Sequence, residues 1–232
     1  MSKFLQFTPC EKCGSSDANA EYDDSYYCFS CNKYTPKLSL KRFKAIKEVR
    51  VCKGITLENK LAVGALKWLL GYGLTSDEIA QFTYARERIG KYGLMPCELL
   101  VLYSSNDYWC ARNFGKGAKY LTSGTKPFLK YGFNQEVLVF VEDIVSAVKV
   151  GRQFTAVPML GSMPSQDAAS HLDGYKDIYI WNDFDKAKEA IRTARNLSER
   201  LNKRVRVVIS PKDPKEYDDN AIKEYIYNNI IY

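Results

Sequence analysis

Four cysteines near the start of the chain have the residue type and spacing of a metal site. They form two matched pairs, Cys10-x2-Cys13 and Cys28-x2-Cys31, with 14 residues between the pairs. Two such pairs can surround one tetrahedral Zn²⁺ with four thiolates, the usual coordination of a structural zinc site. The alternative is two disulfides, which we disfavour because the chain shows no secretory signal. We therefore predict that these four cysteines hold one zinc ion.

Acidic side chains in the last hundred residues form a second set with metal chemistry. They follow three apolar runs, as Glu142 with Asp143, Asp183 with Asp185, and Asp213. Functional groups of a parallel sheet lie at the carboxyl ends of its strands, so these carboxylates are expected to converge. Alternation along an extended chain would point Asp183 and Asp185 to the same side. Converging carboxylates repel one another unless a divalent cation neutralises them, and their oxygens suit Mg²⁺ or Mn²⁺.

The apolar runs that must position these acids alternate with helical segments. Strands are predicted at Val137–Val141, Phe154–Leu160, Asp177–Trp181 and Arg204–Ser210, and helices at Ile144–Val150 and Lys186–Leu201. Strand, helix and strand in this order indicate a parallel sheet that is covered by helices on both sides. The C-terminal region is therefore expected to be an α/β domain with a central parallel sheet.

The middle of the chain mixes helical and strand patterns. Leu57–Gly71 has helical apolar spacing, and Thr75-x-x-Glu78 is a capping box that opens a short second helix. After Gly93 the pattern changes to strands at Glu98–Tyr103 and Tyr108–Arg112, joined by a hairpin turn. This region is expected to be a mixed α+β subdomain.

We therefore expect a multidomain chain of α+β and α/β class. Four regions are predicted: a zinc ribbon over 1–36, a basic linker over 37–52, the mixed subdomain over 53–133 and the α/β domain over 134–232. The ribbon is too short to bury a sufficient apolar core, so metal ligation would supply most of its folding free energy.

The composition is that of a globular protein with a basic excess. The 232 residues are 46% hydrophobic and 26% charged, and Lys plus Arg outnumber Asp plus Glu by 34 to 27. No apolar run approaches the roughly 18 residues that span a bilayer, so we expect no membrane partner and a cytoplasmic location. The excess is concentrated between Lys33 and Arg50, where it suits either contact with a phosphate backbone or an ordinary solvated linker.

The order of the acids, Glu142 after one strand and Asp183-x-Asp185 after a later one, resembles the TOPRIM domain. Together with the four-cysteine ribbon, it makes the whole chain similar to bacteriophage-type DNA primases. Further segments that resemble this family are Pro9–Ala18 in the ribbon, Ala65–Leu70 with Tyr72–Thr75 before the catalytic core, Arg112–Leu121 in the basic strands, and Lys212-Asp213 at the last metal-binding acid.

The chain departs from the usual TOPRIM pattern after the first strand. The family reads Glu-Gly-x-x-Asp, whereas this chain reads Glu142-Asp143-Ile144-Val145-Ser146. The distal aspartate is Ser146, so no metal-binding role is carried over to that position, and Asp143 is a candidate to compensate. The lead glutamate and the Asp-x-Asp motif are intact, so an active site is still expected.

The resemblance implies template-directed synthesis of short RNA primers on single-stranded DNA by metal-dependent nucleotidyl transfer. It assigns Glu142, Asp183, Asp185 and Asp213 to catalysis, the three aspartates being ligands of Mg²⁺ or Mn²⁺. Glu142 is either the general base or a further ligand.

Other residues are candidates for binding nucleotide and template. Arg112 and Lys119 could neutralise the triphosphate of a ribonucleotide, or they could be ordinary exposed basic residues. Asp23, Ser25 and Tyr26 precede the second cysteine pair and could contact exposed base edges of the template. A separate replicative helicase and a DNA polymerase are the partners that this resemblance implies, in the cytoplasm of an infected bacterial host.

Two other functions are compatible with the same motifs. The first is a non-enzymatic DNA clamp of the RecR type, which also carries a four-cysteine zinc element before a TOPRIM domain. Such clamps begin with a helix-hairpin-helix segment, for which Cys10 leaves no room. The second is a TOPRIM nuclease, which could use the same acids to cut rather than to join.

Overall fold

The computed structural model of the chain describes residues 3–23, 25–36, 51–52, 54–161, 163–172, 174–228 and 230–231. The chain divides into two compact units, Met1–Glu48 and Val49–Tyr232, which are described separately below. Most of the predicted basic linker, residues 37–50, lies outside the described residues. Within the described part of the chain, no helix is long and apolar enough to cross a membrane.

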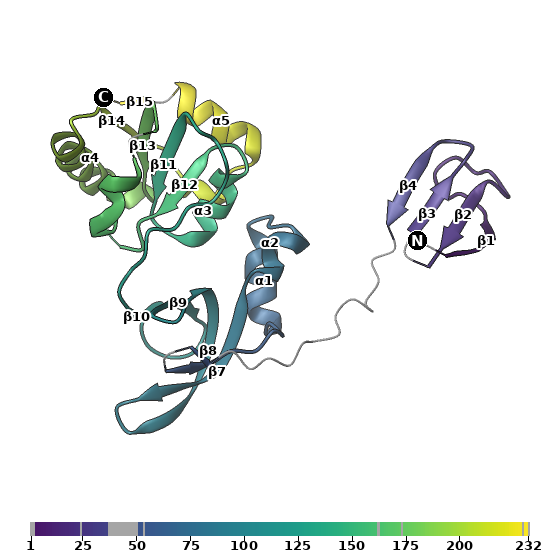
Figure 1. The fold of residues 1–232 in the computed structure, drawn as a ribbon, viewed down its shortest axis with the longest axis horizontal. Coiled ribbons are helices and arrows are strands. Elements are labelled where there is room, and N and C mark those ends of the chain that lie inside the picture. The colour runs from purple at the N-terminus through teal and green to yellow at the C-terminus, as the bar shows by residue number, and fades with distance from the viewer. Residues whose placement is uncertain are drawn as a thin grey trace. The chain divides into compact units, whose positions relative to one another are not determined.

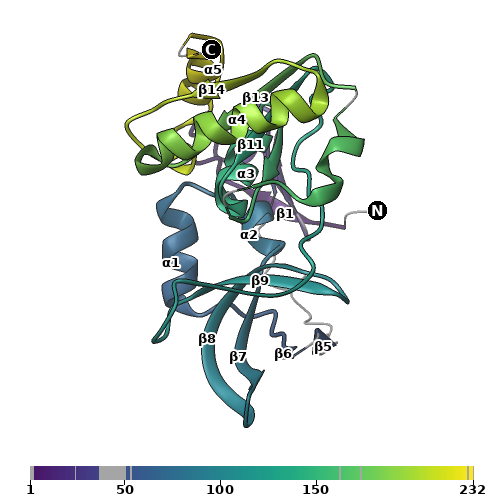
Figure 2. The same cartoon turned by 90° about the vertical axis from the view of Figure 1, so that its left-hand side faces the viewer.

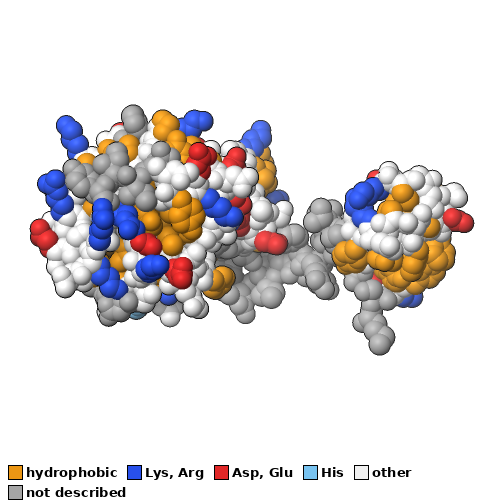
Figure 3. Space-filling model, turned by 90° about the horizontal axis from the view of Figure 1, so that it is seen from above, with side chains coloured by type: hydrophobic (Ala, Val, Ile, Leu, Met, Phe, Trp, Pro, Cys, Tyr) orange, Lys and Arg blue, Asp and Glu red, His pale blue; other side chains and the backbone are white. Residues whose placement is uncertain are grey.

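The small unit is a four-stranded antiparallel sheet in the order β1-β2-β3-β4. The strands are β1 (Phe4–Thr8), β2 (Asn19–Tyr22), β3 (Ser25–Cys28) and β4 (Lys33–Pro36). Few of its side chains are buried, and two of those are cysteines, Cys10 and Cys28. Figure 3 shows apolar side chains gathered on one face of this unit. The predicted ribbon of short strands is confirmed, and its small core gives it little hydrophobic stabilisation.

The large unit begins with a curved antiparallel sheet in the order β10-β9-β8-β7-β6-β5 (Figure 2). Its strands are β5 (Val51–Cys52), β6 (Ile55–Thr56), β7 (Thr83–Gly90), β8 (Gly93–Ser104), β9 (Tyr108–Asn113) and β10 (Tyr120–Gly124). The two strands predicted in this region lie within β8 and β9. Strand β7 was not predicted, because its second half carries charged side chains.

Two short helices, α1 (Val63–Gly71) and α2 (Ser76–Ala80), follow β6 in the chain. The predicted first helix is shorter than expected at its start, because Glu58 forms a β-bridge with Tyr84 instead of a helical turn. The predicted capping box is confirmed. The Thr75 side chain accepts from Glu78 N–H, and the Glu78 carboxylate accepts from Thr75 N–H at 2.7 Å.

The second sheet of the large unit has the order β12-β11-β13-β14-β15, and all of its pairs are parallel except β14 with β15. Its strands are β11 (Val137–Val141), β12 (Thr155–Pro158), β13 (Asp177–Trp181), β14 (Val205–Val208) and β15 (Ile230–Ile231). The four parallel strands lie where the apolar runs predict them. They are buried on both faces, which explains why these runs are continuous rather than alternating.

Helices cover both faces of this sheet, as predicted (Figure 1). They are α3 (Ile144–Gly151), α4 (Ala187–Leu201) and α5 (Asp219–Asn228), with 3-10 turns at η2 (Gln166–His171), η3 (Phe184–Lys186) and η4 (Pro214–Glu216). Successive β11 side chains alternate between the faces. Val139 packs in the cluster that contains α3 and α5 residues, and Leu138 packs in the one that contains α4 residues.

Helix α3 links the two sheets of the large unit. Ile144, Val145 and Val148 pack in the cluster formed with α1, α2 and the antiparallel sheet. Ala147 and Val150 pack in the cluster of the parallel sheet. The helix therefore presents apolar side chains to two cores, and the acidic loop before it lies between both sheets.

Candidate functional site

The four cysteines of the small unit form a cluster with the dimensions of a zinc site. Their ligand atoms all lie within 4.8 Å of one another, with 3.9 Å between the sulfurs of Cys10 and Cys31 and 3.7 Å between those of Cys13 and Cys28. Sulfurs around a tetrahedral zinc lie about 3.8 Å apart, because each Zn–S bond is ~2.3 Å long. Disulfide sulfurs are only ~2.05 Å apart, so the four free thiols fit a metal ion rather than two disulfides.

The first cysteine loop already favours the thiolate that zinc requires. Backbone N–H groups of Cys13 and Lys12 lower the pKa of the Cys10 thiol to about 6. Burial instead raises the pKa of Cys31 to about 11. Because zinc binds thiolates, the Cys31 proton has to leave on metal binding, which makes zinc affinity dependent on pH.

The three predicted template-binding residues have different environments. Asp23 is exposed, and its carboxylate accepts the backbone N–H of Lys3 at 2.9 Å. Tyr26 is partly buried, donates its hydroxyl to Glu21 at 3.4 Å and lines a cavity of 390 Å³ together with basic side chains. Ser25 is buried, with 4% of its surface exposed. Of the three, Asp23 and Tyr26 are therefore accessible to a ligand.

In the large unit, the acids lie at the carboxyl ends of the central strands. Glu142 and Asp143 follow β11, Asp183 follows β13, and Asp213 lies between β14 and η4. Asp143 is also the N-cap of α3, because its carboxylate accepts the Ser146 N–H at 3.0 Å and the Ser146 hydroxyl at 3.3 Å. Position 146 therefore orients Asp143 through its hydroxyl and backbone.

These acids surround one buried ammonium group, that of Lys215 in η4. Its Nζ lies 2.8 Å from Asp143 Oδ2, 2.9 Å from Asp213 Oδ2 and 3.8 Å from Asp183 Oδ2. The Lys215 side chain is 7% exposed, and the ammonium also lies 5.8 Å from the centre of the Tyr72 ring at the end of α1. Among the described residues, the four cysteines are the group of three or more possible metal ligands whose ligand atoms all lie within 4.8 Å of one another. The carboxylates around Lys215 are therefore further apart than that.

The electrostatics of Asp183 and Lys215 follow from burial and close charges. Burial raises the pKa of Asp183 to about 7; the Lys215 ammonium opposes this shift, and the neighbouring carboxylates add to it. Burial alone would lower the pKa of Lys215, but the nearby aspartates, above all Asp143, raise it well above its usual range. The Lys215 ammonium therefore keeps its positive charge among these carboxylates.

Two acceptor oxygens in this cluster have no hydrogen-bond donor. Glu142 Oε1 accepts from Lys186 of η3, whereas the second oxygen, Glu142 Oε2, is buried without a partner. Asp183 Oδ1 is buried without a hydrogen-bond partner as well. An orphaned buried carboxylate oxygen is costly, and hard divalent cations bind such oxygens. Glu142 and Asp183 therefore each offer one buried, unpartnered oxygen of the type that hard divalent cations bind.

The prediction that Asp183 and Asp185 point to the same side assumed an extended chain, and the chain is not extended at Asp185. The chain turns into η3 directly after Asp183, so the alternation of an extended strand does not apply between the two residues. Asp185 is exposed, and it interacts electrostatically with Lys186. The structure thus places Asp183 within the buried cluster and Asp185 at its solvent-facing side.

The predicted nucleotide-binding cations lie on β9 and beside β10, against aromatic rings. The Arg112 guanidinium stacks 4.4 Å from the centre of the Trp68 ring, and it lies 5.5 Å from Phe114 and 5.6 Å from Tyr120. Lys119 Nζ lies 5.6 Å from the Tyr120 ring as well. Arg112 is therefore held by three rings and is not a freely moving surface side chain.

Tyr120 connects these cations to the acids. It lines a cavity of 220 Å³ whose wall includes Glu142 and Asp143, and burial together with the Asp143 charge raises the pKa of its hydroxyl. The rest of the cavity is formed mainly by apolar side chains of the antiparallel sheet and of the segments after β11 and β12. Tyr120 therefore contacts Arg112 and also lines the cavity beside Glu142 and Asp143.

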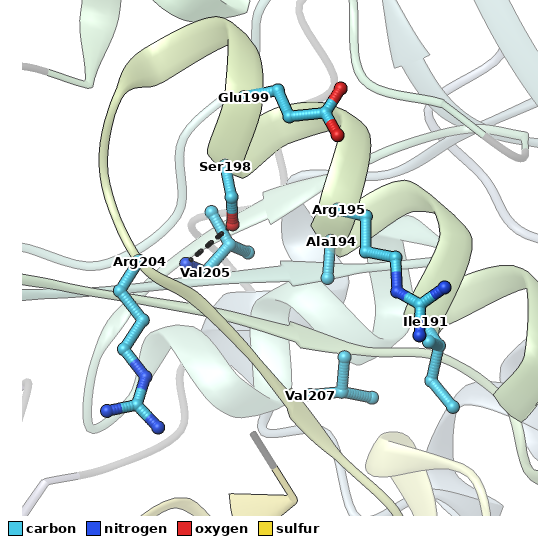
Figure 4. Close-up of a pocket in the computed structure, with 8 residues that line it drawn as sticks. All are labelled: Ile191, Ala194, Arg195, Ser198, Glu199, Arg204, Val205 and Val207. Atoms are coloured by element: carbon cyan, nitrogen blue, oxygen red, sulfur yellow. Dashed lines mark hydrogen bonds between the residues drawn. The ribbon is translucent and has the colours of Figure 1, made fainter.

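A second cavity, of 350 Å³, lies between α4 and β14 (Figure 4). Its base is apolar, from Ala194, Val205 and Val207, and the Ser198 hydroxyl accepts the Val205 N–H at 3.0 Å. It adjoins the beginning of β14, at the end of the sheet opposite to the acidic loops. None of the acids described above lines it, so we do not include it in the candidate site.

Sequence reasoning missed the two lysines of this site, Lys186 and Lys215. Lys186 directly follows the Asp-x-Asp motif, so its position was a possible signal. Lys215 carries no such signal, because nothing in the sequence indicates that its side chain turns inward toward Asp143, which is 72 residues away in the chain.

Comparisons with known proteins show a structural likeness but no sequence match. No protein-family model matches the chain, and no curated protein matches its sequence. Among solved structures, the chain is similar to the primase fragment of the bacteriophage T7 primase-helicase protein. The two are 19% identical with a TM-score of 0.47, over 97% of this chain and 99% of that fragment.

Proposed function

We propose that this protein is a DNA primase, which synthesises short RNA primers on a single-stranded DNA template. The observation that carries the proposal is the convergence of Glu142, Asp143, Asp183 and Asp213 at the ends of parallel strands, with two buried carboxylate oxygens left free. Such an arrangement suits a divalent ion beside a reacting phosphate. The four-cysteine unit and the resemblance of the motifs to phage-type primases support the same assignment.

The reaction joins two ribonucleotides at the acidic site. The 3′-hydroxyl oxygen of one nucleotide attacks the α-phosphorus of the next, the bond to the β-phosphate breaks, and pyrophosphate leaves. A bound Mg²⁺ or Mn²⁺ would activate the hydroxyl and stabilise charge on the leaving group. Glu142 and Asp183 offer free oxygens to hold the ion, and Asp185 and Asp213 are additional candidate ligands. The hydroxyl proton passes to Glu142, if that residue is the base, or to water.

The remaining residues of the site would position the substrates. Arg112 and Lys119 neutralise the triphosphate, and the rings around Arg112 fix the plane of its guanidinium in advance. The cavity beside Tyr120 is largely apolar, which suits a base or sugar rather than a phosphate. These assignments give the site a polar end for the reacting phosphates and an apolar end for the nucleoside.

The zinc unit would bind the template. Asp23 and Tyr26 are its accessible candidates for contact with base edges, whereas Ser25 is buried and would act by supporting their strand. A single-stranded DNA template and ribonucleoside triphosphates are therefore the substrates in this proposal. A separate helicase and a DNA polymerase in the cytoplasm of an infected bacterium are the proposed partners.

A primer-synthesis assay tests the proposal. Purified protein, single-stranded DNA of random sequence, labelled ribonucleotides and Mg²⁺ should give short RNA products whose yield depends on the template. Binding of DNA without any RNA product would favour a clamp. Release of DNA fragments without nucleotide incorporation would favour a nuclease, and either outcome would contradict the proposed activity.

A further inference from the structure

Lys215 is an unusual member of the acidic centre, because it is a cation in the place where carboxylates converge. It makes ion pairs with Asp143 and Asp213 at 2.8 and 2.9 Å, and its side chain is almost completely buried. Burying an ammonium group costs free energy unless opposite charges surround it. Removing either the lysine or the aspartates would therefore leave an uncompensated buried charge. Surface ion pairs have no such mutual dependence.

The neighbours of Lys215 keep its ammonium in this position. The residue belongs to η4, whose turn is closed by the hydrogen bond from Glu216 N–H to Asp213 O at 2.9 Å. The Tyr72 ring lies on the ammonium from the α1 side. The side chain therefore has little freedom to leave the cluster.

The charges of the centre are not balanced by lysines alone. Four carboxylates, of Glu142, Asp143, Asp183 and Asp213, face two ammonium groups, of Lys186 and Lys215, which leaves an excess of two negative charges. Both oxygens without donors belong to Glu142 and Asp183, whereas the Asp143 carboxylate is engaged by Lys215 and by Ser146. One divalent ion near Glu142 and Asp183 would neutralise the excess.

We propose that Lys215 is a permanent, built-in cation of the acidic centre, which takes the place that a second divalent ion would otherwise occupy beside Asp143 and Asp213. The centre then stays assembled without metal and binds a single Mg²⁺ or Mn²⁺, on the Glu142 and Asp183 side. This inference rests on the proposed function for the identity of the metal, but its test measures metal binding and stability rather than primer synthesis.

The test compares Lys215→Met with Lys149→Met. Lys149 is a matched control, because it is a similarly buried lysine that contacts Tyr72 and forms no ion pair with the acidic centre. Thermal unfolding is measured in EDTA and in Mn²⁺, and bound Mn²⁺ is counted by electron paramagnetic resonance. For Lys215→Met we expect a large loss of stability in EDTA, recovery in Mn²⁺, and a second bound ion.

The control and the wild type should behave differently from that variant. Lys149→Met should lose similar stability in EDTA and in Mn²⁺, and should bind as many ions as the wild type, namely one. The inference is overturned if Lys215→Met shows no greater Mn²⁺-dependent stabilisation than Lys149→Met and binds no additional ion. It is also overturned if the wild type binds two Mn²⁺ ions of similar affinity.

If Lys215→Met does not fold, a double variant that leaves the net charge of the centre unchanged still tests the inference. Asp143→Asn with Lys215→Met removes one anion together with the cation, so the double variant should fold in EDTA. Its Mn²⁺ count should return to that of the wild type, because the excess of negative charge is again two. A double variant that needs Mn²⁺ to fold would contradict the inference.

Discussion

At the scale of single residues, the candidate site depends on how each carboxylate is engaged. Asp143 is held by a lysine and a serine, Glu142 by a second lysine through one oxygen, and Asp183 retains a free oxygen and a pKa raised to about 7. Asp183 and Glu142 are therefore the two carboxylates that each retain a buried oxygen without a donor.

Asp183→Asn should abolish most of the primer synthesis and leave the fold intact. The substitution keeps the size of the side chain and removes its charge, and loss of several kcal/mol of metal-assisted stabilisation corresponds to roughly 100-fold or more in rate. Ribonucleotide incorporation on single-stranded DNA measures the effect. Asp107→Asn, at an exposed hairpin turn, is the control that should retain full activity. If Asp183→Asn were equally active, this residue would have no part in the mechanism.

Arg112→Lys should weaken ribonucleotide binding although the charge is conserved. Lysine cannot reproduce the planar stack on Trp68, and the lost contact of about 1–2 kcal/mol should raise KM roughly 5- to 30-fold. Steady-state kinetics with varied ribonucleotide concentration gives KM and kcat separately. Arg86→Lys, which changes an exposed arginine over Tyr84, should leave KM unchanged. An unchanged KM for Arg112→Lys would mean that the guanidinium does not contact the substrate.

At the scale of elements, the parallel strands were the most predictable part of the fold. Val137–Val141 and Asp177–Trp181 agree with the structure at both ends, because these continuous apolar runs are buried on both faces. Helix α5 was missed, although Ile222 and Ile226 are one helical turn apart and both are buried. The 3-10 turn after Asp183 could not be predicted from residue types, because packing around β13 and α4 decides it.

The ion pairs between elements could not be predicted from the sequence. Arg152, at the end of α3, donates to both carboxylate oxygens of Glu78 in α2 at 2.7 and 2.6 Å, and to Asp219 of α5 at 3.1 Å. Residues 78, 152 and 219 are far apart in sequence, and no local pattern relates them. This arginine connects the two halves of the large unit.

Glu78→Gln should destabilise the protein by about 2 kcal/mol at pH 7, because it removes charge-assisted hydrogen bonds in a partly buried pair. Glutamine preserves the capping role at this position. Burial opposes the shift, but the Arg152 hydrogen bonds lower the pKa of Glu78 below its usual value. The stabilisation is therefore complete above the usual glutamate pKa and is lost as the pH falls through the lowered one.

Urea unfolding at pH 7 and at a series of lower pH values measures this dependence, and the difference between wild type and variant should shrink as the pH falls below the usual glutamate pKa. Glu58→Gln is the matched control, because its pair with Arg86 is exposed and should contribute less than about 1 kcal/mol. Equal effects of the two substitutions would contradict the role given to Arg152.

At the scale of the whole molecule, the two units are stabilised by different forces. The large unit has four clusters of buried apolar residues, whereas the small one has a buried core that consists largely of cysteines and a few small side chains. The cysteine spacing alone predicted this difference, because so short a segment needs metal ligation to fold.

Cys28→Ser should therefore unfold the small unit and leave the large one unchanged. With one thiolate fewer, zinc affinity falls, and the zinc content of the purified protein should decrease well below one ion per chain. Two-dimensional NMR would show the loss of dispersed signals from residues of the first four strands only. Cys97→Ser, at a free cysteine outside the cluster, should keep both zinc and signals. Loss of the large unit's signals as well would show that the units do not fold independently.

Helix α3 has a consequence for how the large unit moves. Each of its side chains from Ile144 to Val150 is buried, and among the described residues it is the one helix that contributes buried side chains to both of the cores that enclose it. A hinge that opened the large unit at this helix would expose apolar surface on both of its sides at once. The amide hydrogens of α3 should therefore exchange with solvent only when the whole large unit unfolds.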